Sequence, residues 1–272
     1  MDRMNVIPMM VLCLLGNACA SRADTMQPSA TIASTAEAAD SPADVAWTIS
    51  PDLGDTVLLR LDVGIDGLGG IAGVRESLFP TLLILGDGSV LRPRTPQADR
   101  PLVPQFEIAK LDQADVDRIF QRAQQVGLLG DLDYGNPRDT DGGWTRLAIS
   151  LPNGETKRQS AYGLDFVAET PDRKTLADFV ALLNDVRFAD AEQYQPTSYR
   201  ISASRALPAG TSTAGVASWP LQELSPGDCI DATPEQIAML PAEATLGTTF
   251  QLDGTIFDLA VAPVFPDGSS VC

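Results

Sequence analysis

The feature that most constrains the fold is a strand–turn–strand–helix pattern that occurs twice in succession. The first copy places apolar strand segments around a Gly-Asp-Gly turn at 86–88, and the second places strands around a Pro-Asn-Gly turn at 152–154. Such residues tolerate the positive φ that tight hairpin turns require. Two tandem hairpin–helix units predict an antiparallel sheet with both helices packed on one face, which is an α+β fold.

Both predicted helices carry start signals and an apolar stripe. Asp112 is placed to cap the first helix and Gly127 to end it, and the i, i+3, i+4, i+7 spacing predicts that the buried stripe is Val116, Ile119, Phe120 and Ala123. The second helix begins with Thr170 as N-cap and Pro171 at the first helical position. Its predicted stripe consists of Leu176, Phe179, Val180 and Leu183.

Composition divides the chain into a leader, a tether and folded parts. We expect a signal peptide at 1–20, a disordered tether at 21–46, an α+β domain of two hairpin–helix units at 47–205, and a C-terminal helix–hairpin subdomain at 219–272. The C-terminal hairpin turns at an Asp-Gly pair at 253–254. The sequence leaves open whether this hairpin extends the main sheet or pairs within its own subdomain.

The N-terminal segment predicts export. Residues 4–18 form an apolar run that is typical of a signal peptide and too short to span a bilayer. The following residues allow two outcomes. In the first, Cys19 is lipidated and becomes the first mature residue, so that the protein is an outward-facing membrane lipoprotein. In the second, cleavage after Ala20 releases a secreted protein. The Ala-, Ser-, Thr-, Asp- and Pro-rich stretch at 20–44 favours a lipid anchor with a flexible tether.

Cysteine usage agrees with an oxidising compartment. Once Cys13 has left with the leader and Cys19 is lipidated or removed, Cys229 and Cys272 remain as an even pair. We expect them to form a disulfide, which closes a 44-residue loop and stabilises the fold by roughly 4 kcal/mol on chain-entropy grounds. A metal site is the alternative, but two lone cysteines without histidine make a poor one.

Charge and histidine content exclude several functions. With 36 acidic and 19 basic residues the net charge is −17, which argues against nucleic acid and anionic lipid surfaces as partners. The basic residues are scattered, and no basic patch is readable. The chain contains no histidine, so Ser-His-Asp, Cys-His and His-zinc mechanisms are excluded, and we expect no cofactor.

Two loops and three tryptophans are candidate functional features. The glycine-rich segment at 67–73 matches part of a dinucleotide fingerprint but lacks the helix that must follow, so it is read as a mobile loop. The loop at 130–143 offers weak calcium ligands at Asp131, Asp133, Asn136, Asp139 and Asp141. Gly135 breaks the EF-hand order, which favours a turn stiffened by Asx hydrogen bonds. We expect Trp47, Trp144 and Trp219 in the core.

Several segments together resemble one protein family. They are GDGSVL, QQVGLLGD, LDYGNPRDTDGG, the PNG and SAYG pieces, WPL, the surroundings of Cys229, and the final VAPVFPDGSSVC. Over most of residues 55–272 the chain is similar to a family of uncharacterised, mostly actinobacterial exported lipoproteins. The resemblance implies export, a similar fold and pairing of the last cysteine, and it implies no activity.

These observations predict a non-catalytic binding or accessory module of the bacterial envelope, tethered to the membrane through Cys19. Its partner would be an envelope protein or glycan, bound by the glycine-rich or Asp-rich loop. The alternative is a carboxylate-dependent hydrolase of cell-wall glycans, because that reaction needs only two suitably separated carboxyl groups. A deep cleft with two carboxylates would favour the hydrolase, and a flat patch would favour the binding module.

Overall fold

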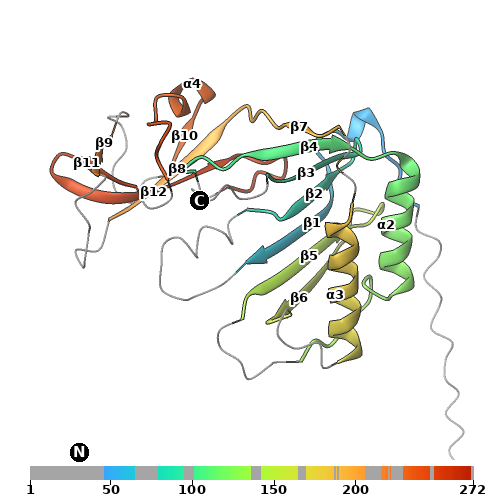
Figure 1. Ribbon diagram of the computed structural model, residues 1–272. Helices are drawn as coiled ribbons and strands as arrows, with labels where there is room; N and C mark the ends of the chain where they lie inside the picture. The colour runs from blue at the N-terminus through green and yellow to red at the C-terminus, as the bar shows by residue number, and fades with distance from the viewer. Residues whose placement is uncertain are drawn as a thin grey trace, which may run out of the picture. The chain divides into compact units, whose positions relative to one another are not determined.

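The computed structural model describes residues 46–64, 79–94, 101–135, 142–164, 170–186, 188, 190–205, 216–219, 221, 229–245 and 248–270. Within these ranges the protein is a mixed α+β fold with two mostly antiparallel sheets and few helices (Figure 1). The predicted signal peptide, Cys19, the glycine-rich loop at 67–73 and Cys272 lie outside the described residues. The expectations about them therefore stay predictions.

The first sheet has seven strands, and all of its pairings are antiparallel. In spatial order the strands are β6 (Thr156–Tyr162), β5 (Trp144–Ser150), β1 (Val57–Gly64), β2 (Leu82–Leu85), β3 (Ser89–Pro93), β4 (Phe106–Lys110) and β7 (Glu192–Gln193). A short 3₁₀ turn, η1 (Pro51–Leu53), precedes β1. β1 thus joins the two hairpin units, since β2, β3 and β4 lie on one side of it and β5 and β6 on the other.

The two long helices begin at the predicted caps. α2 (Gln113–Gln125) has its N-cap at Asp112, whose side chain accepts a hydrogen bond from the Asp115 amide. α3 (Pro171–Asn184) has its N-cap at Thr170. The predicted α2 stripe is fully buried, whereas in α3 Val180 is only partly buried and Arg173 is buried instead. Val180 packs against the core without being fully buried, so three of the four predicted stripe residues are fully buried and the first turn adds an arginine to the inward face.

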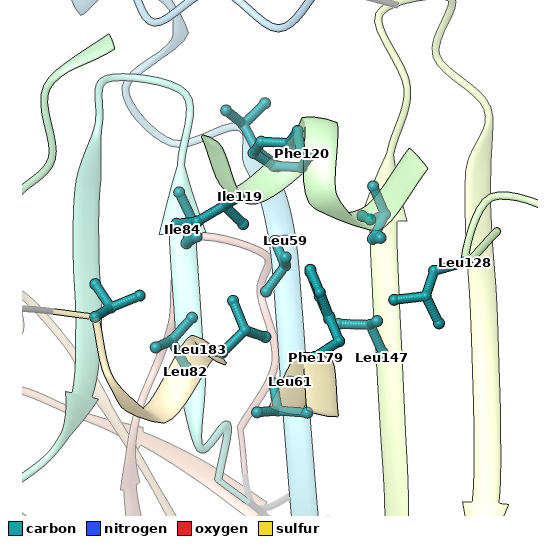
Figure 2. Close-up of a cluster of buried hydrophobic side chains, with 14 of the residues drawn as sticks. Leu59, Leu61, Leu82, Ile84, Ile119, Phe120, Leu128, Leu147, Phe179 and Leu183 are labelled. Carbon is teal, nitrogen blue, oxygen red and sulfur yellow. The ribbon is translucent and has the colours of Figure 1, made fainter. Parts of the chain in front are cut away.

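A single hydrophobic core lies between one face of this sheet and both helices. Figure 2 shows side chains from the sheet and from the helices meeting there, among them Leu59, Leu61, Leu82, Ile84, Ile119, Phe120, Leu128, Leu147, Phe179 and Leu183. Burying each side chain of this size contributes about 1.5–3 kcal/mol relative to leaving it in water. Trp47 closes one end of the core by stacking on Phe120, with 4.6 Å between ring centroids.

On the opposite face of the sheet, the apolar cluster among the described residues lies along β2, β3 and β4 and at the start of β1. Side chains alternate between the two faces of a strand, so Leu83 and Leu91 point away from the helices and pack with Phe106 and Phe265. The rings of Phe106 and Phe265 meet edge to face with centroids 5.0 Å apart. The chain segment that follows the last strand therefore covers this half of the face.

The C-terminal hairpin belongs to a second, five-stranded sheet. The strand order is β10 (Cys229–Ala232), β8 (Tyr199–Arg205), β12 (Thr255–Pro263), β11 (Thr249–Leu252) and β9 (Val216–Ser218). β9 and β11 are parallel and the other pairs are antiparallel. The hairpin turns at Asp253 and Gly254 with φ of 47° and 78°, as the Asp-Gly pair predicted. A short helix, α4 (Pro234–Ile237), starts with a capping box at Thr233.

Candidate functional site

The most distinctive surface is the half of the first sheet that carries polar and aromatic side chains on the side away from the helices. We call this half the outer face, and define it by Trp144, Arg146 and Ala148 of β5 and Arg158, Ser160 and Tyr162 of β6. The register pairs these residues directly across the two strands. The alternate residues of β5, such as Leu147 and Ile149, point into the helix-covered core. The strand period of two thus separates a buried row from an exposed one.

The aromatic end of the outer face has a defined geometry. Trp144 and Tyr162 are partly exposed, and their rings meet at an interplanar angle of 62° with centroids 5.2 Å apart. The guanidinium carbon of Arg146 lies 5.5 Å from the centroid of a Trp144 ring, within the range of a cation–π interaction. Gly142 donates its amide hydrogen to Tyr162 Oη over 3.0 Å, which orients the phenol. Two aromatic rings and a cation therefore form one partly solvent-exposed group.

The outer face is basic in an acidic protein. β5 and β6 read WTRLAIS and TKRQSAY and contain no acidic residue, although the chain as a whole carries a net charge of −17. Arg146 and Arg158 are exposed and occupy diagonal positions of the β5–β6 register, a spacing of roughly 7–8 Å that long side chains bridge. Lys157 pairs with Glu155 over 2.6 Å. The face thus concentrates positive charge on two neighbouring strands.

A charge network centred on Arg60 of β1 borders the outer face. Arg60 Nε donates to both carboxylate oxygens of Asp62, over 3.0 and 2.9 Å, and Arg60 also bonds to Asp267 and Ser269. Burial alone would raise the pKa of Asp267, but the hydrogen bonds from Ser269 and the Arg60 charge outweigh it and lower the pKa. The network thus holds two carboxylates around one guanidinium, and Asp62 lies opposite Arg146 in the β1–β5 register.

A buried glutamine supports β6 from the core side. Gln159 Nε2 donates to the carbonyl oxygens of Leu128 and Gly130 over 2.9 and 2.8 Å. Its Oε1 accepts a hydrogen bond of 2.8 Å from Tyr134 Oη. Burial, followed by the charge of Asp172, raises the pKa of Tyr134, so the phenol stays a donor at neutral pH. These bonds fasten the segment after α2 to β6.

Arg173 extends this support to the aromatic end of the outer face. Its side chain is 2% exposed and donates to the carbonyl oxygens of Tyr134, Tyr162 and Gly163 over 3.0, 2.8 and 2.7 Å. Charge-assisted hydrogen bonds are roughly twice as strong as neutral ones. The end of β6, which carries Tyr162, is therefore held in place by a cation from the first turn of α3.

The predicted calcium ligands are only partly described. Asp131 and Asp133 belong to the described residues, whereas Asn136, Asp139 and Asp141 lie outside them. Asp133 Oδ1 accepts the Gly135 amide hydrogen over 2.8 Å, and the Asp133 amide donates to Asp172 over 3.0 Å. The first of these is the Asx turn that the sequence favoured. Within the described ranges no three His, Cys, Asp or Glu side chains are grouped to hold a metal ion.

A groove between the helices contains two carboxylates and is the place to look for the hydrolase alternative. Its lining consists of Asp115, Arg118, Ile119, Leu182, Asp185 and Val186. Asp115 already pairs with Arg118 over 2.7 Å. A glycosidase needs one carboxyl group with a raised pKa as general acid. Asp87 is partly buried and lies outside the lining of this groove. Burial alone would raise its pKa, but hydrogen bonds from Lys110 and Ser89 outweigh burial and lower the pKa. A lowered pKa suits a permanent anion rather than a general acid.

The tryptophans and arginines show what sequence reasoning missed. Trp47 and Trp219 are buried at 4% and 6% exposure, as predicted. The prediction was wrong for Trp144, which is partly exposed on the outer face. Arg146 and Arg158 looked scattered in the sequence, yet strand pairing brings them to one surface. The available signal was the run of two predicted strands without a single acidic residue.

Comparisons of the chain with models of known protein families, with curated protein sequences and with solved structures found no match. In the described ranges, no helix combines the length and apolar character needed to cross a membrane. The fold and the site define an acidic α+β protein with one basic, aromatic sheet face.

Proposed function

We propose that this protein is an exported envelope protein, anchored through a lipid on Cys19, that acts as a non-catalytic binding module. The outer face is the observation that carries the proposal, because it gathers Trp144, Tyr162 and two exposed arginines on two neighbouring strands of the sheet. Aromatic and arginine side chains supply most of the energy at binding surfaces.

The tether sets how far this module reaches from the membrane. If the segment at 21–46 is the flexible tether that its composition predicts, its end-to-end distance is roughly 25–30 Å. Anchoring raises the effective concentration of the binding surface near the envelope, so that a modest affinity suffices. The resemblance to exported lipoproteins supports this arrangement.

The C-terminal disulfide between Cys229 and Cys272 is part of the proposal. Cys229 begins β10 and faces Ser202 of β8 in the register. Ser270, two positions before Cys272, accepts a hydrogen bond from Arg200 of β8 over 3.1 Å. These contacts support the pairing because they bring the chain end to the strand beside Cys229.

The intact mass of the mature protein from native membranes tests the anchor and the disulfide. A diacyl or triacyl mass on Cys19, with a gain of two hydrogens on reduction, is the expected result. A chain that starts at Ser21 without modification would show release from the membrane. An unchanged mass on reduction would contradict the disulfide.

Binding to envelope fragments from the source cells tests the outer face. We expect the wild-type chain to sediment with the fragments, and Trp144→Ala and Arg158→Gln to sediment less. Arg122→Gln is the matched control, since it removes the same charge from the exposed surface of α2, in the helix layer on the other side of the sheet. If the wild-type chain releases soluble glycan pieces and Asp115→Asn does not, the result would favour the hydrolase instead.

A further inference from the structure

We infer that the ligand of the outer face is an acidic polysaccharide, a chain of sugar rings that carry carboxylate groups. This inference rests on the proposed binding function and names the class of ligand. Three features of the outer face lead to it: its aromatic rings, its charge relative to the rest of the protein, and its open, elongated form.

The aromatic end suits the apolar face of a sugar ring. The Trp144 indole is partly exposed and is held by the edge-to-face contact with Tyr162. Tyr162 is in turn fixed through its backbone by Arg173 and through its hydroxyl by Gly142. A rigid aromatic platform loses little conformational entropy when a ligand stacks on it. A sugar ring offers C–H groups to such a platform, and a bare polyphosphate chain does not.

The charge pattern selects an anionic chain. Arginine pairs with carboxylates through two parallel hydrogen bonds, and Arg158 is exposed at one end of this face. Among the described residues, Asp62 lies opposite Arg146 in the β1–β5 register and binds Arg60, and Glu155 binds Lys157. Arg158 is therefore the cation that this inference assigns to the ligand. With a net charge of −17, the remaining surface repels an acidic polymer. Charge complementarity therefore directs such a ligand to the outer face.

The form of the face suits a polymer. From the Trp144–Tyr162 pair to the Ala148–Arg158 pair the register runs over four residues, a distance of about 13 Å along the strands. The exposed side chains form an open row with the aromatic pair at one end and Arg158 at the other. An extended chain contacts both ends, whereas a single sugar reaches one.

Titration of the full mature chain with three polymers tests this inference. The probes are polygalacturonate, which has sugar rings and carboxylates, dextran, which has rings without charge, and polyphosphate, which has charge without rings. We expect polygalacturonate to bind and to bind more weakly as salt concentration rises. Arg158→Gln and Trp144→Ala should each lower its affinity by about tenfold, the loss of one good contact, while Arg122→Gln on the exposed surface of α2 leaves it unchanged.

The other outcomes would overturn the inference in distinguishable ways. Dextran binding equal to that of polygalacturonate, and sensitive only to Trp144→Ala, would keep the binding face and reject an acidic ligand. Polyphosphate binding that depends on Arg158 and not on Trp144 would reject a sugar. Absence of polygalacturonate binding would reject the ligand class, and the envelope sedimentation assay would still test the face. Because Arg158 is exposed, Arg158→Gln stays informative even if Trp144→Ala unfolds.

Discussion

Replacing Gln159 by leucine should lower the free energy of unfolding by more than the small change in side-chain size would suggest. The side chain is 6% exposed and makes three hydrogen bonds, to Leu128, Gly130 and Tyr134. Gly130 is exposed, so its carbonyl can turn to water, but the Leu128 carbonyl and the Tyr134 hydroxyl lose buried bonds. Each buried group left unsatisfied costs about 1–3 kcal/mol. Allowing for the apolar gain of leucine, we expect the free energy of unfolding to fall by about 3 kcal/mol.

Urea unfolding with a double-mutant cycle measures this effect. Tyr134→Phe should cost about 1–2 kcal/mol, because it leaves Gln159 Oε1 without its donor. The double variant should cost less than the sum, since both changes remove the same bond. Gln251→Leu on the exposed side of β11 is the matched control, with an effect within about 0.5 kcal/mol. Equal costs for Gln159→Leu and Gln251→Leu would refute the reasoning.

Three further predictions concern pH and local geometry. The pKa of Asp267 is lowered, so its contribution to stability is present above the ordinary aspartate pKa of about 3.9 and is lost as pH falls through the folded value. Asp267→Asn should therefore flatten the acid limb of the stability profile, and an unchanged limb would count against the Arg60 network. A Cβ on Gly88, where φ is 79°, would lie 2.8 Å from the Leu111 carbonyl oxygen, whereas Gly154 at φ 86° has open space. Thermal unfolding should show Gly88→Ala losing about 3 kcal/mol and Gly154→Ala about 1 kcal/mol; similar losses would show that the contact does not matter. Thr233→Ala should remove the α4 capping box and cost about 1 kcal/mol in urea unfolding, and a neutral result would mean that packing alone holds this turn.

Much of the fold could be predicted because its signals are local. The caps at Asp112 and Thr170, the hairpin turns and the α2 stripe each depend on residues within a few positions of one another. Short-range geometry decides whether a capping oxygen reaches an amide or a residue adopts positive φ. These features are the same in any tertiary context that keeps the element.

The pairing of distant strands could not be predicted in this way. β8 precedes β12 by about fifty residues, yet the two pair over seven positions, and no local pattern distinguishes this partner from a strand of the first sheet. The site was missed for the same reason. Trp144 and Arg158 share the outer face only through the β5–β6 register. The burial of Arg173 depends on three carbonyl groups from two distant segments of the chain.

The most direct test of the binding face is hydroxyl-radical footprinting of the mature protein with and without envelope fragments. Trp144 and Tyr162 are partly exposed and reactive in the free protein, whereas Trp47 is buried. Met239, with 57% exposure, is an internal reference away from the outer face. We expect the fragments to protect Trp144 and Tyr162 from oxidation while Met239 stays reactive. Protection elsewhere, with Trp144 and Tyr162 oxidised as in the free protein, would contradict it.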